Sequence, residues 1–339
     1  MEKLYVGIDL HSNNNVISII DGENKQIYCG KLKNSLNVVL EKLAPYKEGI
    51  SGIVVESTFN WYWLVDGLME NGYKLHLSNP GANEQYSGKK NINDKNDARW
   101  LADLLRLNIL KEGYVMDAKR RAIRDLCRKR MQLVRMRTSN ILSIRNLFSR
   151  NLGAITAKEI SKTESDQLIE LFGDKNLVRA VSANKSVIHT LNAEIKDIEK
   201  IILNQINLAW EFQKLKTIKG VGDILAQTIM LEVGNIERFK KVGNFASYSR
   251  CVSADKISNG KKKGRGNRKN GNKYLSWAFT EAAISSIHWN PDAKKFYERK
   301  KKKTMTVVAI KALAHKIARA SYYIMKDQVE FDSAKLFGH

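Results

Sequence analysis

Cysteine is scarce in this chain, and its few thiols stand apart from one another. Cys29, Cys127 and Cys251 are the three cysteines among 339 residues, and no two of them have C-x-x-C spacing. Structural zinc sites and disulfide frameworks need clustered or paired cysteines. The sequence therefore indicates neither kind of site.

Proline and long apolar runs are also rare. The chain has three prolines, which leaves long uninterrupted helices available to its second half. No apolar run reaches the length of a membrane span, and the start MEKLYVGIDL lacks the apolar core of a signal peptide. Hydrophobic residues make up 43% of the chain, which is typical of folded proteins. We expect a folded cytoplasmic protein of two or three domains, with no membrane partner.

Acidic residues are outnumbered by basic ones. The sequence contains 58 Lys and Arg against 35 Asp and Glu, which gives a formal net charge of +23. Such an excess predicts a polyanionic partner, most simply nucleic acid. A membrane surface fits less well, because the basic stretches lack the wide apolar face of an interfacial helix.

The first hundred residues alternate between predicted strands and helices. Strands are expected at 4–12, 16–21, 25–32, 52–57 and 73–78. Helices are expected at 36–46, 60–72 and from 93 onward. The order of three strands, helix, strand, helix, strand, helix is typical of an α/β ribonuclease H-like (RuvC-like) domain.

Helical patterns dominate the rest of the chain. A long basic helix is expected at 117–150 and a heptad-like helix at 186–206, followed by helices at 274–289 and 306–326. We predict three regions: a RuvC-like domain at 1–150 that ends in the basic helix, a helical coiled-coil connector at 151–208, and a mainly α domain at 209–339.

Four carboxylates are predicted to converge in the first region. Asp9 lies within the first strand and Glu56 ends the fourth, and these strands are neighbours in a ribonuclease H-like sheet. Asp94 and Asp97 lie one helical turn apart, on the face that also carries apolar residues. Asp103 lies on another face and is expected to form a surface salt bridge.

This carboxylate quartet predicts a metal site. Carboxylates in a first helical turn are favourable by themselves, which would explain one aspartate. Two inward-facing aspartates together with Asp9 and Glu56 would repel strongly without a cation. Oxygen ligands favour Mg²⁺ or Mn²⁺ over zinc.

Three segments are candidates for nucleic-acid contact. In the long basic helix the candidates are Arg120, Arg121, Arg124, Arg128, Lys129 and Arg135. Gly220 and Gly222 lie in KGVGD, which fits either a phosphate-binding helix-hairpin-helix turn or a plain packing turn. The segment 256–273 has no acidic residue and fits an exposed phosphate-contacting loop or a solvated linker; its candidates are Lys256, Lys261, Lys262, Lys263, Arg265, Arg268 and Lys269.

Several motifs, taken in order, resemble one family. GIDLHS, VVEST, NDKNDARWLADLL, GVGDILAQTIMLEVG and ISNGKKKGRGN are similar to the Asp-Glu-Asp-Asp (DEDD) insertion-sequence transposases, and the likeness covers nearly the whole chain. The resemblance implies that Asp9, Glu56, Asp94 and Asp97 are catalytic metal ligands. This chain differs from the family at Ser12, where many relatives carry Lys.

The resemblance further implies a nucleophilic serine, at Ser258. Relatives commonly have Ser-Gly at this position, whereas this chain has Ser258-Asn259-Gly260. Ser253 is the competing serine and fits less well, because it precedes the basic loop. No histidine adjoins Ser258 in sequence, so a hydrolase triad has no support.

By the same resemblance, the partners are donor and target DNA, a noncoding bridge RNA and further copies of the chain. The copies would form a dimer or tetramer that shares each active site between subunits, in the cytoplasm of a bacterium or archaeon and acting at the nucleoid. Two other functions stay open: a metal-dependent RuvC-like junction nuclease with no covalent serine intermediate, and a non-catalytic RNA-binding scaffold. The carboxylate quartet argues against the scaffold.

Overall fold

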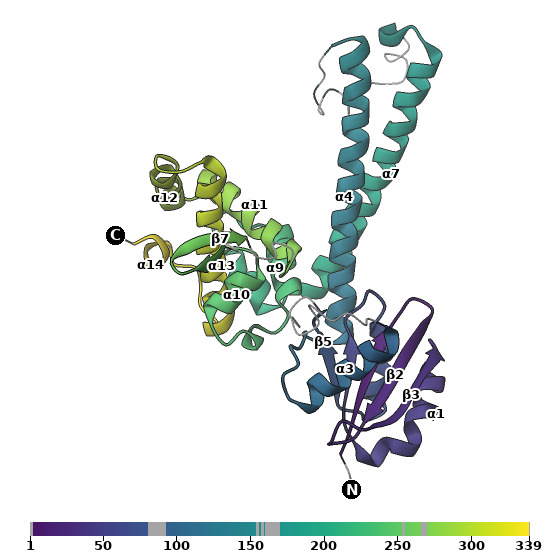
Figure 1. The fold of residues 1–339 in the computed structure, drawn as a ribbon. Coiled ribbons are helices and arrows are strands. Elements are labelled where there is room, and N and C mark those ends of the chain that lie inside the picture. The colour runs from purple at the N-terminus through teal and green to yellow at the C-terminus, as the bar shows by residue number, and fades with distance from the viewer. Residues whose placement is uncertain are drawn as a thin grey trace. The chain divides into compact units, whose positions relative to one another are not determined.

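The chain folds into two compact units. The computed structural model describes residues 3–80, 93–153, 156, 159, 170–252, 255–265 and 270–338. Contacts divide the chain into residues 1–118 and 119–339 (Figure 1). None of the helices in the described ranges has the length and apolar character that crossing a bilayer requires.

A mixed five-stranded sheet forms the centre of the first unit. Its strands are β1 (Leu4–Leu10), β2 (Asn14–Ile20), β3 (Gln26–Lys33), β4 (Ile50–Glu56) and β5 (Leu75–Ser78). Their order is β3-β2-β1-β4-β5, in which β1 pairs antiparallel with β2 and parallel with β4. The predicted sequence of strands and helices is confirmed, and the sheet is consistent with a ribonuclease H-like fold.

Strand alternation gives β1 two different faces. Val6, Ile8 and Leu10 join a hydrophobic core with α1 (Leu36–Leu43) and α2 (Tyr62–Glu70). Gly7 and Asp9 point to the opposite face, which α3 (Asp94–Arg106) covers (Figure 1). One strand therefore supplies core residues on one side and a polar site on the other.

The absence of a side chain at Gly7 lets α3 lie directly on the sheet. A Cβ atom at this position would lie 1.9 Å from the carbonyl oxygen of Ala98 and 2.7 Å from the backbone nitrogen of Ala102. Ala98 and Ala102 are themselves fully buried. Small residues on both elements thus bring the helix backbone into contact with the strand.

The second unit is mostly helical, as predicted. Its longest helices are α4 (Ala118–Asn151) and α7 (Lys175–Ile206), which lie side by side (Figure 1). An ion pair of 2.7 Å joins Arg130 to Glu199, and Phe148 shares a hydrophobic cluster with Val181. Residue numbers rise along one helix as they fall along the other, so the pair is antiparallel.

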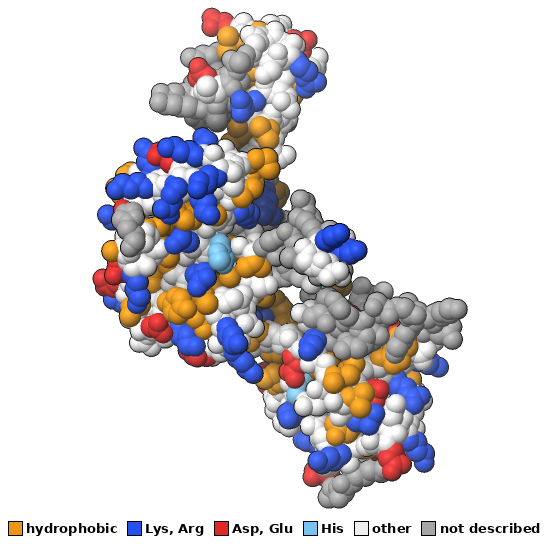
Figure 2. All heavy atoms as spheres, turned by 60° about the vertical axis from the view of Figure 1, so that its left-hand side comes forward, with side chains coloured by type: hydrophobic (Ala, Val, Ile, Leu, Met, Phe, Trp, Pro, Cys, Tyr) orange, Lys and Arg blue, Asp and Glu red, His pale blue; other side chains and the backbone are white. Residues whose placement is uncertain are grey.

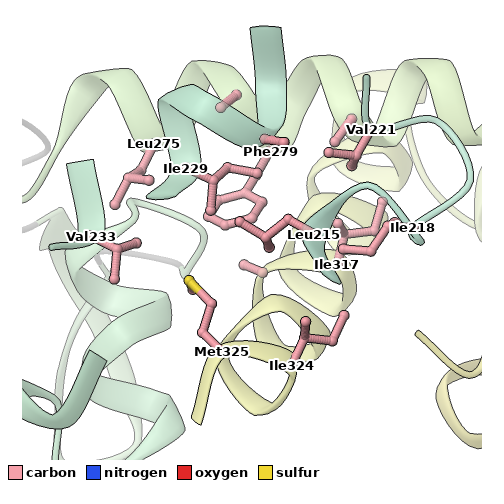
Figure 3. Close-up of a cluster of buried hydrophobic side chains, with 14 of the residues drawn as sticks. Leu215, Ile218, Val221, Ile229, Val233, Leu275, Phe279, Ile317, Ile324 and Met325 are labelled. Atoms are coloured by element: carbon pink, nitrogen blue, oxygen red, sulfur yellow. The ribbon is translucent and has the colours of Figure 1, made fainter. Parts of the chain in front are cut away.

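Shorter helices enclose a separate hydrophobic core. They are α8 (Trp210–Leu215), α9 (Asp223–Val233), a 3-10 turn η4 (Ile236–Arg238), α10 (Val242–Tyr248), α11 (Lys273–Trp289), α12 (Pro291–Lys301), α13 (Thr306–Asp327) and α14 (Ser333–Phe337). Figure 3 shows Phe279 of α11 amid Leu215, Ile229 and Ile317 from three other helices. This core holds the helices that flank the predicted serine.

A hairpin and a helix of this unit were not predicted although the sequence contains signals for both. Residues 255–265 form a β-hairpin of β6 (Asp255–Ser258) and β7 (Lys261–Arg265), where an irregular loop was expected. The turn residues Asn259 and Gly260 have φ values of 49° and 70°, and Asn-Gly is a strong hairpin signal. Helix α12 was also missed, although Asn290 caps it and Pro291 occupies its first turn.

The contact at Gly7 generates a stability prediction. Gly7→Ala should displace α3 from the sheet and lower the free energy of unfolding by about 1–3 kcal/mol, since the new methyl group would overlap helix backbone. Thermal unfolding would measure the loss. Gly22→Ala is the matched control, because no atom lies within 4 Å of its added Cβ. Equal melting temperatures for the two variants would contradict the close approach.

Candidate active site

Asp9 and Glu56 form a carboxyl pair at one edge of the sheet. The parallel register of β1 and β4 reaches Ile8 opposite Val55, so Asp9 and Glu56 come next to each other. A side-chain hydrogen bond joins their carboxyl groups, and Asp9 is only 4% exposed. Two carboxyl groups that share a hydrogen bond must hold a proton between them.

The surroundings of this pair favour protonation. Burial raises the pKa of Asp9 and outweighs the opposing effects of His11 and of the hydrogen bond with Glu56, while the charge of Asp94 adds to the increase. Burial, followed by the charge of Asp9, raises the pKa of Glu56 from its usual 4.5 to about 7. The charge of Asp97 acts in the same direction on Glu56, and that of His11 opposes it. The cluster is therefore short of positive charge.

Helix α3 supplies the other two predicted carboxylates. Its N-cap residue Asn93 accepts a hydrogen bond of 2.9 Å from the backbone N–H of Asn96, which fixes the first turn. Asp97 is half-buried and lies close enough to Glu56 to affect its ionisation. Asp94 was expected to point inward, but its side chain is 54% exposed at the rim of the cluster.

His11 belongs to the cluster and was missed in the sequence. Its Nε2 atom lies 3.1 Å from Oδ2 of Asp9 and 3.5 Å from Oδ2 of Asp94. The signal was present in GIDLH, because residues two apart on an extended chain share a face. The imidazole thus stands between a buried carboxylate of the sheet and an exposed carboxylate of the helix.

Hydrogen bonds hold the backbone of His11 in place. Its carbonyl oxygen accepts from Nδ2 of Asn34 at 2.9 Å and from Nδ2 of Asn60 at 3.0 Å. Its N–H donates to the carbonyl oxygen of Asn14 at 2.9 Å. Thr58 in turn donates its hydroxyl proton to Oδ1 of Asn60 at 2.9 Å, which orients that amide. Three separate parts of the chain therefore fix the backbone of the histidine before any ligand binds.

The cluster has the donors that a divalent cation requires. One ligand atom each from Asp9, His11 and Asp94 lie within 4.8 Å of one another. The hydrogen-bonded Glu56 and the half-buried Asp97 add further carboxylate oxygens beside them. A cation bound here would replace the shared proton and offset the repulsion among the carboxylates.

Ser258 lies at the tip of the hairpin in the second unit. It ends β6, is exposed, and is paired with Lys261 across the turn. Lys261 and Lys263 are exposed as well. Ser253, Arg268 and Lys269 lie outside the described residues, as do the side chains of Lys256, Lys262 and Arg265.

Hydrogen bonds join the two segments that flank the β6–β7 hairpin, which we call the serine hairpin because it carries Ser258. The backbone N–H of Asn272 donates to the carbonyl oxygen of Tyr248 at 2.6 Å. Nε of Arg250 donates to the carbonyl oxygens of Asn270 and Gly271, each at 3.1 Å. Gly271 has a φ of 85°, and a Cβ there would lie 2.5 Å from the oxygen of Tyr248. The two ends of the segment are thereby held together.

The basic residues of α4 fall into two groups. Arg121 is only 3% exposed, and Arg128 forms a two-pronged ion pair with the buried Glu232, at 2.6 and 2.7 Å. Glu232 also accepts from Nδ2 of Asn272 at 2.7 Å, so this pair reaches the base of the hairpin. Arg124 is half-buried beside Asp125. The exposed candidates on this helix are Arg120, Lys129 and Arg135.

The two glycines before α9 have different surroundings. A Cβ on Gly220 would lie 2.6 Å from the backbone nitrogen of Ser286, so this glycine allows α11 to approach. Gly222 has open space around it and is the N-cap of α9. Asp223 follows it and pairs with Lys216 at 2.7 Å. Gly222 is therefore the more accessible of the two.

Comparison with known proteins agrees with both units. Residues 6–151 match a transposase family model of the DEDD type, and residues 212–298 match the model described as "Transposase IS116/IS110/IS902 family". A "Probable family 20 transposase" of Pseudomonas aeruginosa is 24% identical over 280 residues, covering 78% of this chain and 80% of that protein.

A second relative has the same degree of identity. The "Transposase for insertion sequence element IS1111A" of Coxiella burnetii is 24% identical over 280 residues, covering 80% of this chain and 74% of that protein. The DEDD model, with the Asp-His-Asp cluster of the first unit, indicates the use of a divalent metal. The chain belongs to the IS116/IS110/IS902 family of insertion-sequence transposases.

Proposed function

We propose that this transposase cuts and rejoins DNA through Ser258, assisted by a divalent cation at the carboxylate cluster. The observation that supports the cation site most directly is the hydrogen-bonded pair of Asp9 and Glu56, with a Glu56 pKa of about 7. Such a pair in a folded domain is unfavourable unless protons or a cation neutralise it. A purely structural cluster would need no such carboxyl pair at the carboxyl ends of two neighbouring strands.

The ligands of the cation would be Asp9, Glu56, Asp94 and Asp97. Their oxygens suit Mg²⁺ or Mn²⁺, and the imidazole of His11 suits Mn²⁺ better than Mg²⁺. A cation bound there polarises a phosphodiester and stabilises its developing negative charge. The half-exposed Asp94 leaves the rim of the cluster open for a phosphate to approach.

The exposed hydroxyl of Ser258 is suited to direct attack on phosphorus. Its oxygen would form a bond to the scissile phosphate and lose its proton, while the departing DNA oxygen takes up a proton. The covalent phosphoserine keeps the energy of the phosphodiester, so a second DNA end can reverse the step without ATP. Lys261, paired with Ser258 across the turn, would offset charge on the phosphate.

The remaining partners are proposed on charge and family grounds. The exposed cations of α4 (Arg120, Lys129 and Arg135) would bind the backbone of a structured bridge RNA. The open N-terminus of α9 at Gly222 would contact a phosphate of DNA, as in a helix-hairpin-helix turn. A dimer or tetramer would bring the serine of one copy to the carboxylates of another.

Substitution of the serine tests the proposed function. Ser258→Ala should abolish both strand cleavage and exchange, because no other group would form the covalent intermediate. Wild-type protein quenched with denaturant during the reaction should carry DNA on the peptide that contains Ser258, detected by mass spectrometry. Ser253→Ala is the control and should retain most activity. Metal-dependent cleavage by Ser258→Ala would instead make water the nucleophile and favour the junction nuclease.

Removal of the charge of Glu56 tests the metal site. Because the pKa of Glu56 is about 7 in the fold and about 4.5 when unfolded, the folded state binds more protons between these values. Stability in EDTA should therefore fall as the pH rises from about 4.5 to 7. Glu56→Gln should melt about 5 °C higher than wild type at pH 8 but equally at pH 4.5.

Addition of a divalent cation to the same melting experiment provides a second test of the metal site. At pH 8, Mn²⁺ should raise the melting temperature of wild type more than that of Glu56→Gln, since the variant has lost a charged ligand. Equal shifts for the two proteins would place the cation elsewhere. Asp103→Asn is the matched control, because Asp103 forms a salt bridge with Arg106 at 2.8 Å instead of facing the cluster.

Substitution of exposed basic residues by glutamine tests the proposed RNA-binding role of α4. Lys129→Gln with Arg135→Gln should weaken RNA binding and reduce the slope of log K against log salt by about 1.5–2, from two lost phosphate contacts. Filter binding over a salt series would measure it. Both side chains are exposed, so the fold should be unaffected. An unchanged slope would indicate that the RNA binds to another surface of the protein.

A further inference from the structure

A dense group of cations lies on two helices of the second unit. Residues 291–319, which include α12 and the first part of α13, contain ten Lys and Arg but only Asp292 and Glu298 as acids. Figure 2 shows Lys and Arg side chains gathered over the part of this unit that contains α12, with few acidic ones among them. Helix α12 was not expected from the sequence, so its charge was not assigned to a surface.

The cations of the two helices converge. Burial lowers the pKa of Lys316 on α13, and the charge of Arg299 on α12 lowers it further. The charges of Arg319 and Lys300 act on Lys316 in the same direction. We call Lys295, Arg299, Lys300, Lys316 and Arg319 the α12–α13 cation patch.

Among the residues that the structure describes, no carboxylate forms an ion pair with the exposed cations of this patch. In the described part of the chain, Lys295, Arg299, Lys300 and Arg319 form no ion pair within 4.0 Å, although all four are exposed. The nearby Asp292 instead accepts a hydrogen bond of 2.9 Å from the hydroxyl of Ser333.

The cations of α4 differ from those of the patch, because several of them form ion pairs within the protein. There Arg128 and Arg130 pair with Glu232 and Glu199, so much of the charge of that helix is already used inside the protein. Like charges that converge without carboxylate partners are unfavourable until an anion binds. The α12–α13 cation patch therefore has the electrostatics of a surface that binds a polyanion.

The aromatic side chains of the patch indicate what kind of polyanion it is. Phe296 is only 8% exposed, and the cationic groups of Lys316 and Arg299 lie 5.2 and 5.8 Å from its ring centre. Phe337 lies under Lys316 as well, at 5.6 Å. Proteins that hold single strands stack bases on open aromatic rings. Phe296 is buried and Phe337 is half-buried beneath these cations, so the two rings offer little open surface for stacking. The patch is therefore suited to contacts with the phosphates of a duplex and not to stacking of bases.

We propose that the α12–α13 cation patch binds the backbone of duplex DNA, independently of its sequence. It would hold donor or target DNA on the unit that carries Ser258, and this surface is additional to α4 and to the serine hairpin. The inference requires only that the transposase binds DNA, and not that Ser258 is the nucleophile. Ser258→Ala should therefore bind duplex DNA with the salt dependence of wild type.

Neutralisation of three patch residues tests the proposal. The full-length variant Arg299→Gln, Lys300→Gln, Arg319→Gln should bind a mixed-sequence DNA duplex about tenfold or more weakly near physiological salt. The slope of log K against log salt should fall by about 2–3, since each lost phosphate contact lowers it by about 0.9. Fluorescence anisotropy in the absence of RNA would measure both, and circular dichroism would check that the helices persist.

A variant with the same charge change is the control. Lys25→Gln, Lys31→Gln, Lys33→Gln removes three exposed charges from the first unit and should lower the slope far less. If both triple variants lost DNA affinity equally, the loss would come from the change in net charge alone, and the proposal would be overturned. A loss confined to an RNA duplex of the same length, with DNA binding unchanged, would overturn it too. A loss on DNA supports it whether or not RNA binding also falls.

Discussion

The backbone contact between α3 and β1 at Gly7 is the constraint on which the candidate metal site depends. Because Gly7 has no side chain, the carbonyl of Ala98 lies against the strand, and the first turn of α3 follows toward the end of β1. That turn carries Asp94 and Asp97, and the strand end carries Asp9 and His11. A helix held even one side-chain width farther away would separate Asp94 and Asp97 from the pair of Asp9 and Glu56, which the pairing of β1 with β4 holds together.

Each unit has a cluster of like charges without enough opposite charge: carboxylates in the first unit and cations in the second. In the first, burial and neighbouring carboxylates raise the pKa of Glu56 to about 7, so the site requires protons or a cation. In the second, burial and the cations of α12 and α13 lower the pKa of Lys316. Among the described residues, the exposed cations of the α12–α13 cation patch form no ion pair within 4.0 Å. The first cluster suits a metal ion and the second suits phosphates, which are the two groups that a DNA-cleaving enzyme must hold.

Local patterns predicted the ribonuclease H-like sheet because each of its elements has a strong signal of its own. The strands of 4–10 and 50–56 are apolar runs, and α3 follows a clear N-cap. Asp103 could be assigned to a salt bridge from helical spacing alone, and it pairs with Arg106. The hairpin at 255–265 and helix α12 were missed, although Asn259-Gly260 and Asn290-Pro291 are local signals that announce them.

The sequence by itself determined the chemistry available: four carboxylates in the right elements, an excess of cations, and a serine before a turn. Tertiary structure decided which of these groups meet. It placed His11 between Asp9 and Asp94, turned Arg121 and Arg128 inward, and joined cations of α12 to those of α13. Spacing along one helix or strand fixes only the face on which a residue lies. Whether that face meets water, a carboxylate or another cation depends on the elements packed against it, which the local pattern does not specify.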